Sequence, residues 1–132
     1  YKRYDKMLKY STGIFKALGV PIRVVESCSG DLADLKAKGC DIEAWSPRQK
    51  KYFEVTSLTN MGEAQARRLN IKIDDGKKRY FAHTLNNTVI ATSRALVAIM
   101  ENNQQKDGSI LIPKILQKYM HGKKKIEAKK SK

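Results

Sequence analysis

The predicted β-strands of this chain are separated by turns as often as by helices, and this order constrains its fold most. Short alternating or β-branched runs predict the strands, and turn signals such as Asp75-Gly76 and the proline at position 47 fall between them. Such an order favours an antiparallel or mixed sheet with helices packed on it, which is an α+β fold. The strands are expected at residues 22–26, 41–45, 52–59, 71–73 and 79–83.

Apolar residues at helical spacing predict the other elements. An amphipathic helix is expected over residues 2–18, before the stop signal that ends at Pro21. A short helix should cover 64–69, and the longest helix is expected at 88–103. A last short helix should end near Met120.

The chain is strongly basic. It has 27 lysines and arginines against 13 acidic residues, a net charge of +14 and a pI near 9.9. This excess favours an anionic partner such as a nucleic acid or a nucleotide. The less favoured alternative is that the positive charge reflects a basic proteome or a requirement for solubility. Residues 1–121 are assigned to one domain portion, and the charged tail at 122–132 is expected to be disordered.

Several classes of protein are disfavoured by what the sequence lacks. It has no run of 18 apolar residues and no signal-peptide pattern, so a cytoplasmic protein with no membrane partner is expected. Cys28 and Cys40 stand apart without a CxxC pair, which argues against a zinc site or a disulfide framework. Neither GxGxxG nor GxxxxGK[ST] occurs, so a Rossmann or P-loop nucleotide site is disfavoured.

A short polar turn that opens an apolar helix is the most informative functional pattern. Residues 84–94 supply Asn86, Asn87 and Thr88, and then Arg94 in the first turns of the predicted helix. Backbone N–H groups and the positive end of the helix dipole gather at such a point, so the combination suits a polyphosphate. From the pattern alone, a simple turn with Thr88 as N-cap and Arg94 as a surface charge explains it equally well.

The strand at 52–59 carries the second pattern. Glu54 and Ser57 would normally face opposite sides of a strand, so a twist or bulge would be needed to bring both to one cation. Taken alone, Glu54 is most simply a solvated charge at a sheet edge. Alternation predicts Phe53, Val55 and Ser57 on one face, with Tyr52, Glu54 and Thr56 on the other.

These segments together resemble one family. Residues 54–60 and the Gln-Ala-Arg-Arg at 65–68 are similar to the stretch between motifs 2 and 3 of seryl-tRNA synthetases. Residues 84–101 resemble motif 3 of class II aminoacyl-tRNA synthetases in its seryl form. The turn at 27–32 and the strand at 41–47 match further family segments. The resemblance implies part of a class II synthetase catalytic domain, an antiparallel or mixed sheet flanked by helices.

The resemblance also implies a nucleotide site. In the family, the residues matching Glu54 and Ser57 hold a divalent metal, expected here to be Mg²⁺, at the α- and β-phosphates of ATP. The backbone matching Val55 and Thr56 lines the nucleotide, and Arg94 is placed on the γ-phosphate. Glu54 and Arg94 are therefore the expected catalytic residues.

The amino-acid substrate follows from the same resemblance. The resemblance places Thr88 in contact with serine and Asn86 near the serine hydroxyl. An amino acid that lacks a hydroxyl would leave the polar groups of such a site unpaired, and the site would therefore reject it. The implied activity is that of a serine–tRNA ligase, which converts serine and ATP to seryl-adenylate and transfers the seryl group to tRNA(Ser). A homodimer is expected for the full-length protein.

Only the C-terminal third of the family pattern is present. The helical arm, motif 1 and motif 2 with its phosphate-binding arginine are absent, and the chain begins at Tyr1 rather than Met. We therefore expect a fragment that is inactive alone. Two alternatives remain open, a synthetase-like ligase that charges a carrier protein and a non-catalytic basic module that binds RNA.

Overall fold

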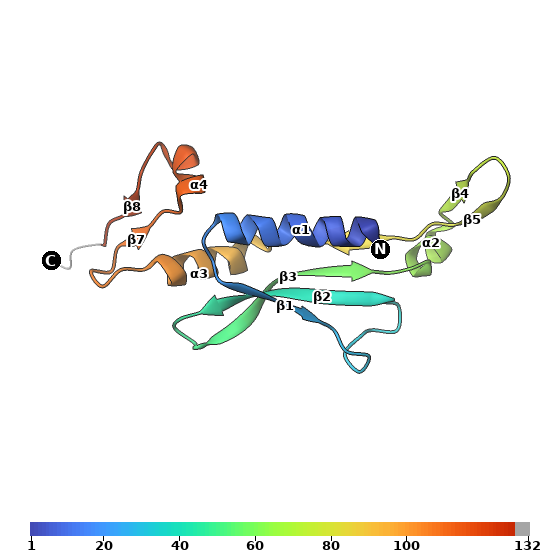
Figure 1. Cartoon of the computed structure of the whole chain (residues 1–132), viewed down its shortest axis with the longest axis horizontal. Helices are drawn as coiled ribbons and strands as arrows, with labels where there is room; N and C mark the ends of the chain where they lie inside the picture. The colour runs from blue at the N-terminus through green and yellow to red at the C-terminus, as the bar shows by residue number, and fades with distance from the viewer. Residues whose placement is uncertain (129–132) are drawn as a thin grey trace.

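The computed structural model describes residues 1–128 and contains a four-stranded sheet with helices on one side (Figure 1). The strands lie in the order β1-β2-β3-β6, and every neighbouring pair is antiparallel. The predicted α+β fold with an antiparallel sheet is therefore confirmed. The four strands are β1 (Ile22–Glu26), β2 (Lys38–Ser46), β3 (Lys51–Asn60) and β6 (Leu85–Asn87).

The core lies between this sheet and helices α1 (Lys2–Ala17) and α3 (Thr92–Asn103). Phe15 of α1 is completely buried, and such burial contributes about 1.5–3 kcal/mol, so this side chain anchors the helix. Ala95 and Ala98 are small and buried, which lets α3 lie close to the strands. Within the described residues no helix covers the other side of the sheet, which we call the open face (Figure 1). The main core cluster consists of Phe15, Leu18, Val20, Ile42, Ala44, Val55, Ala95 and Ala98.

A β-bulge at Val55 interrupts the alternation of β3. Glu54 and Thr56 pair with two adjacent residues of β2, so Val55 is the extra residue between them. From the bulge onward each side chain changes face, and both Val55 and Thr56 are buried in the core. The two faces predicted for this strand are therefore wrong beyond Val55: Ser57 lies on the open face together with Glu54.

Between β3 and β6 the chain leaves the sheet and then returns to it. The excursion contains α2 (Ala64–Leu69), which has the predicted bounds, and a hairpin of β4 (Lys72–Asp74) and β5 (Arg79–Phe81). The hairpin turn is held by Asp75, whose Oδ1 accepts the backbone N–H groups of the two lysines that follow Gly76, each at 2.9 Å. The predicted turn at this place is confirmed.

The two ends of the excursion meet in a neck of backbone hydrogen bonds. The N–H of Met61 donates to the carbonyl of Thr84 at 2.9 Å, and the N–H of Thr84 donates to the carbonyl of Gly62 at 3.0 Å. These bonds lie just beyond the last pair of β3 and β6, so the ladder between the two strands is closed at that end.

Helix α3 begins at Thr92, four residues later than predicted. Val89 has a left-handed φ of 64°, and its N–H donates to the side chain of Asn87 at 2.8 Å. This turn keeps the expected first turn out of the helix, and the N–H of Ala91 donates instead to the carbonyl of Val55 at 3.2 Å. The longest described helix is α1 with 16 residues, not α3 with 12, so that prediction was wrong. Neither these helices nor any other within residues 1–128 is long and apolar enough to span a membrane.

The C-terminal region is ordered further than expected. It contains β7 (Ile110–Leu111), α4 (Lys114–Gln117) and a 3₁₀ helix η1 (Lys118–Met120), which confirms the predicted end near Met120. The tail expected to be disordered instead forms β8 (Lys125–Ile126), which pairs antiparallel with β7. That expectation is wrong at Lys125–Ile126, and residues 129–132 lie outside the described residues.

Candidate functional site

The bulge brings the two candidate metal-binding side chains of β3 together. Glu54 and Ser57 both project from the open face, with Glu43 and Asp41 of β2 directly opposite them. The sequence required a twist or bulge to place Glu54 and Ser57 on one side, and the structure contains one at Val55. A carboxylate and a hydroxyl therefore lie on the same uncovered surface.

Arg94 reaches this surface from the first turn of α3. Within the described residues, β6 pairs with β3 at Leu58–Asn60. The edge of β3 before these residues instead faces the start of α3, where the N–H of Ala91 donates to the carbonyl of Val55. The Nη1 atom of Arg94 lies 3.1 Å from Oε2 of Glu54 and donates to the Glu54 carbonyl at 3.3 Å. The two side chains are 51% and 43% exposed, and exposed ion pairs contribute only about 0–1 kcal/mol. An anionic ligand can therefore replace this contact at little cost.

Negative charge is concentrated beside this ion pair. Burial raises the pKa of the Asp41 carboxyl, and the charge of Glu54 raises it further. Glu43 is neutralised by Arg23, whose Nε lies 2.5 Å from its Oε2. The charges of Lys36 and then of Arg94 oppose that of Asp41, and Arg94 also forms the ion pair with Glu54.

The donor set fits a hard cation that is shared with a ligand. Within residues 1–128 no group of three or more His, Cys, Asp or Glu side chains is arranged to hold a metal ion. Glu54 and Ser57 offer two oxygen donors on one face, which suits Mg²⁺, a cation that commonly takes its other ligands from water and substrate phosphates. The residues present therefore fit Mg²⁺ only as part of a complex with a phosphate-bearing molecule.

The two side chains assigned to the amino-acid substrate are both exposed. Asn87 of β6 points toward the helices, where its Nδ2 donates to the hydroxyl of Ser11 at 2.8 Å. Because side chains alternate along a strand, the preceding Asn86 projects from the open face. Thr88 follows β6 directly and is exposed. Among the described residues, no hydrogen bond joins the side chains of Asn86 and Thr88 to those of Glu54, Ser57 and Arg94.

Val55 and Thr56 turn their side chains away from the open face. Val55 is completely buried, and its carbonyl is occupied by the N–H of Ala91 at 3.2 Å. The Thr56 hydroxyl is buried and finds no hydrogen-bond partner within residues 1–128. Only the backbone of these two residues can therefore line a ligand on the open face.

Sequence reasoning overlooked the acidic neighbours on β2. Asp41 and Glu43 alternate on the predicted strand, and this spacing was a signal that both share a face. It also overlooked Glu101, which follows Arg94 by two helical turns and contacts the turn between β2 and β3. The seven-residue spacing of Arg94 and Glu101, the two charged residues of α3, was the available signal.

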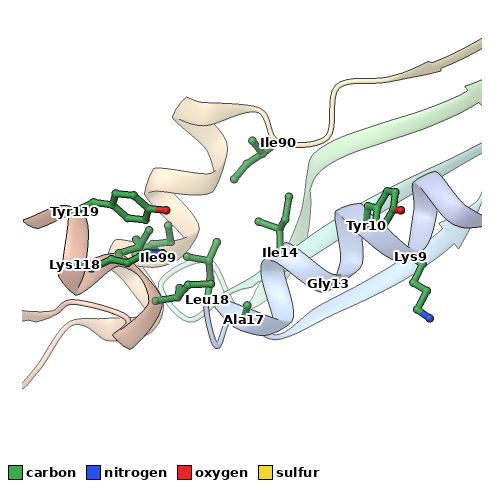
Figure 2. A pocket seen from close by; sticks show the side chains of 12 residues that line it. Lys9, Tyr10, Gly13, Ile14, Ala17, Leu18, Ile90, Ile99, Lys118 and Tyr119 are labelled. Carbon is green, nitrogen blue, oxygen red and sulfur yellow. The ribbon is translucent and has the colours of Figure 1, made fainter.

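A second concave surface lies on the helix side of the sheet. It is a groove of about 540 Å³ between α1, α3 and α4, lined chiefly by apolar side chains that include Ile14, Ile90, Ile99 and Leu116 (Figure 2). Its polar side chains are two lysines and two tyrosines at the rim, Lys9, Tyr10, Lys118 and Tyr119, and it contains no carboxylate, histidine or cysteine. The polar residues of the open face are the better candidate for a site.

The sequence pattern of a known family matches residues 1–103. This family is described as the tRNA synthetase class II core domain (G, H, P, S and T). Because the match covers well over half of the chain, this chain belongs to the class II tRNA synthetase core family. The resemblance drawn from its motifs is confirmed.

Proteins similar to this chain in sequence and fold carry the names serine–tRNA ligase and seryl-tRNA synthetase. The chain is 52% identical over 126 residues to a serine–tRNA ligase from Methanocella arvoryzae, covering 92% of this chain and 29% of that protein. Its structure is similar to that of seryl-tRNA synthetase from Pyrococcus horikoshii complexed with ATP, with a TM-score of 0.93 and 47% identity over 98% of this chain and 29% of that one. A cytoplasmic serine–tRNA ligase from Naegleria fowleri in complex with AMP gives a TM-score of 0.90 and 40% identity, covering 98% and 30%. The chain therefore spans less than a third of these relatives.

Proposed function

We propose that this chain is the C-terminal part of the catalytic domain of a serine–tRNA ligase. Such a ligase joins serine to ATP, releases pyrophosphate, and passes the seryl group to tRNA(Ser). The names of the relatives support the activity, and the ATP and AMP in the structures of two of them support a nucleotide as substrate. Because those relatives are more than three times longer, the activity belongs to the full-length ligase, and the 132-residue chain alone is expected to be inactive.

The observation that carries this proposal is the bulge-dependent placement of Glu54 and Ser57 on one face of the sheet, with Arg94 in contact with Glu54. In the proposed site, Arg94 exchanges its contact with Glu54 for the γ-phosphate of ATP. Glu54 and Ser57 would then hold Mg²⁺ at the α- and β-phosphates, where the metal supplies charge neutralisation. The backbone at Val55 and Thr56 lines the nucleotide. Catalysis by these residues consists of positioning and charge stabilisation.

The same proposal gives Asn86 and Thr88 the serine substrate. Both are exposed polar side chains at the end of β6, next to the strand that carries Ser57. An amino acid without a hydroxyl would leave such groups unpaired, which is the basis for discrimination in polar pockets. We further propose a homodimeric full-length ligase that works in the cytoplasm, supported by the family resemblance and by the name of the Naegleria fowleri relative.

Serine-dependent exchange of pyrophosphate into ATP tests the proposal in the full-length ligase. Arg94→Ala should lower kcat/KM for ATP about 10- to 100-fold, as expected for the loss of a hydrogen bond to a charged group. Arg68→Ala removes an exposed arginine of α2 and serves as the matched control, with no change expected. Exchange that is indifferent to serine, or unaffected by Arg94→Ala, would overturn the proposal. The same assay on the 132-residue chain should give no exchange.

A further inference from the structure

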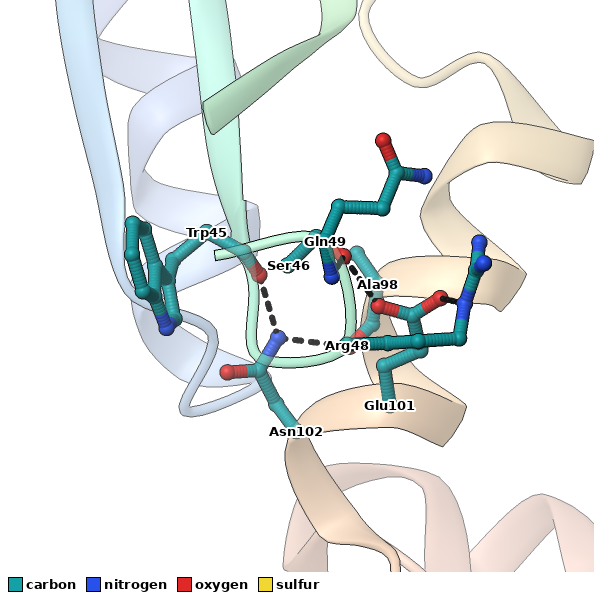
Figure 3. A network of polar contacts seen from close by, with 7 residues as sticks. All are labelled: Trp45, Ser46, Arg48, Gln49, Ala98, Glu101 and Asn102. Atoms are coloured by element: carbon teal, nitrogen blue, oxygen red, sulfur yellow. Dashed lines mark hydrogen bonds and ion pairs between the residues drawn. The ribbon is translucent and has the colours of Figure 1, made fainter. Parts of the chain in front are cut away.

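A polar network joins the C-terminal half of α3 to the turn between β2 and β3 (Figure 3). The carboxylate of Glu101 accepts a hydrogen bond from the hydroxyl of Ser46 and one from Nε of Arg48, the latter at 2.8 Å. The next residue, Asn102, donates through Nδ2 to the carbonyl of Trp45 at 2.8 Å. Two consecutive residues of α3 therefore bind the last two residues of β2, Trp45 and Ser46, and Arg48 of the turn that follows.

This network is built around an enclosed carboxylate. The Glu101 side chain is only 13% exposed, and Ser46 is completely buried. The hydrogen bond from Ser46, and then the one from Arg48, hold the pKa of Glu101 below its ordinary value. Glu101 is thus an ionised group with a fixed orientation, unlike the many solvated charges elsewhere on this basic chain.

Glu101 and Arg94 lie on the same side of α3. They are two turns apart, which corresponds to about 10 Å along the axis and only about 20° around it. Both contact the antiparallel pair of β2 and β3: Arg94 through Glu54, and Glu101 through the turn that connects the strands. Between them Ala98 is completely buried and allows close approach.

Two fixed points on one rigid hairpin determine how α3 is rotated and how far it slides. Besides the packing of Ala95, the polar contacts that join the start of α3 to β3 within residues 1–128 are the Ala91 N–H on the Val55 carbonyl and the exposed contact of Arg94 with Glu54. If Arg94 leaves Glu54 to bind phosphate, the second contact is lost. The side-chain contacts that still fix the helix against the hairpin are then those of the Glu101 network, beside the backbone bond of Ala91.

We propose that Glu101 is a positioning residue that holds α3 so that the Arg94 guanidinium stays at the nucleotide site while it changes partners. This inference rests on the proposed function, because it assigns to Arg94 a phosphate ligand. Glu101 itself touches no substrate. Its effect on the reaction must therefore pass through Arg94.

A double-mutant cycle in the full-length ligase tests this dependence. Arg94→Ala, Glu101→Gln and the double variant are compared in serine-dependent pyrophosphate exchange, with kcat and KM for ATP measured separately. Glu101→Gln keeps the size of the side chain and removes its charge. In the ligase that retains Arg94, Glu101→Gln should lower kcat/KM for ATP about three- to thirty-fold. A loss of this size corresponds to a coupling energy between Glu101 and Arg94 within the range found for residues of one network. In the Arg94→Ala background the same change should have less than about a twofold effect.

A purely structural role predicts a different result. Equal fold-losses from Glu101→Gln in both backgrounds, or no loss in either, would overturn the inference while leaving the proposed function intact. If Arg94→Ala itself causes no loss, both proposals fail. Arg48→Ala, which removes the exposed partner of Glu101, provides a second variant that should repeat the pattern with a smaller effect. Glu63→Gln, on the ion pair with Arg67 in α2, is the matched control and should change nothing.

Discussion

Replacing Thr56, whose buried hydroxyl has no hydrogen-bond partner within the described residues, should stabilise the protein. Thr56 is buried on the core side of β3 opposite Ile42, and its Oγ1 has no hydrogen-bond partner within the described residues. A buried hydroxyl left unpaired costs about 1–3 kcal/mol, and valine has the same branched shape with a methyl in its place. Thr56→Val should therefore raise the free energy of unfolding by about 1–3 kcal/mol. For a chain of this length each kcal/mol corresponds to about 3–4 °C in Tm.

Urea and thermal unfolding, followed by circular dichroism, measure this change directly. Ser46→Ala is the matched comparison, because it removes a buried hydroxyl that does have partners, Glu101 and the N–H of Gln49. It should destabilise by about 1 kcal/mol or more. A loss of stability in Thr56→Val would show that its hydroxyl is paired and would refute the reasoning. Because only the backbone of Thr56 is proposed to line the nucleotide, exchange activity should not change.

Three further predictions address charge, thiols and metal. Hydrogen bonds in the folded protein lower the pKa of Glu101, so its contribution to stability is complete above the ordinary value of 4.5 and is lost as the pH falls through the lower folded pKa. Between about pH 5 and 3 the free energy of unfolding of the wild type should therefore fall more than that of Glu101→Gln. Parallel curves of stability against pH for the two proteins would contradict this. Cys28 is exposed whereas burial raises the pKa of Cys40, so a thiol reagent at pH 8 should modify Cys28 first and Cys40 only on unfolding, as mass spectrometry of peptides would show. In the full-length ligase, Glu54→Gln should raise the Mg²⁺ concentration for half-maximal exchange more than Ser57→Ala, because it removes a charge; an unchanged Mg²⁺ dependence in both would argue against the metal site.

Much of the fold could be predicted from local patterns. The helix at α2 and the turn at Asp75-Gly76 depend on residues close in sequence, and both were predicted correctly. The start of α3 was missed because the Asn87 side chain captures the N–H of Val89, which a helical periodicity does not reveal. The tail was misjudged because β8 is ordered by pairing with β7, a contact that its charged composition does not show.

The site was less accessible to sequence reasoning than the fold. Alternation separates Glu54 from Ser57, and only the register of β2 against β3 shows that Val55 is an extra residue. A β-bulge has no reliable local sequence signal. The alternation of β3 therefore showed that a bulge would be needed to bring Glu54 and Ser57 to one face, but it could not show that the bulge exists. The contact of Arg94 with Glu54 likewise depends on how α3 meets the edge of β3, which is a tertiary property.

The neck formed by Met61, Gly62 and Thr84 makes the segment between β3 and β6 a self-contained cassette. Its two ends are fastened to each other by two backbone hydrogen bonds, and the Gly62 N–H also donates to the Asn60 side chain of β3, so the hairpin is separated from the sheet by this bonded neck. Lengthening a closed loop costs little, about 0.6 kcal/mol per doubling. The exposed tip of the hairpin at Gly76 is therefore a place where the loop can be lengthened with little effect on how β3 and β6 present their polar side chains.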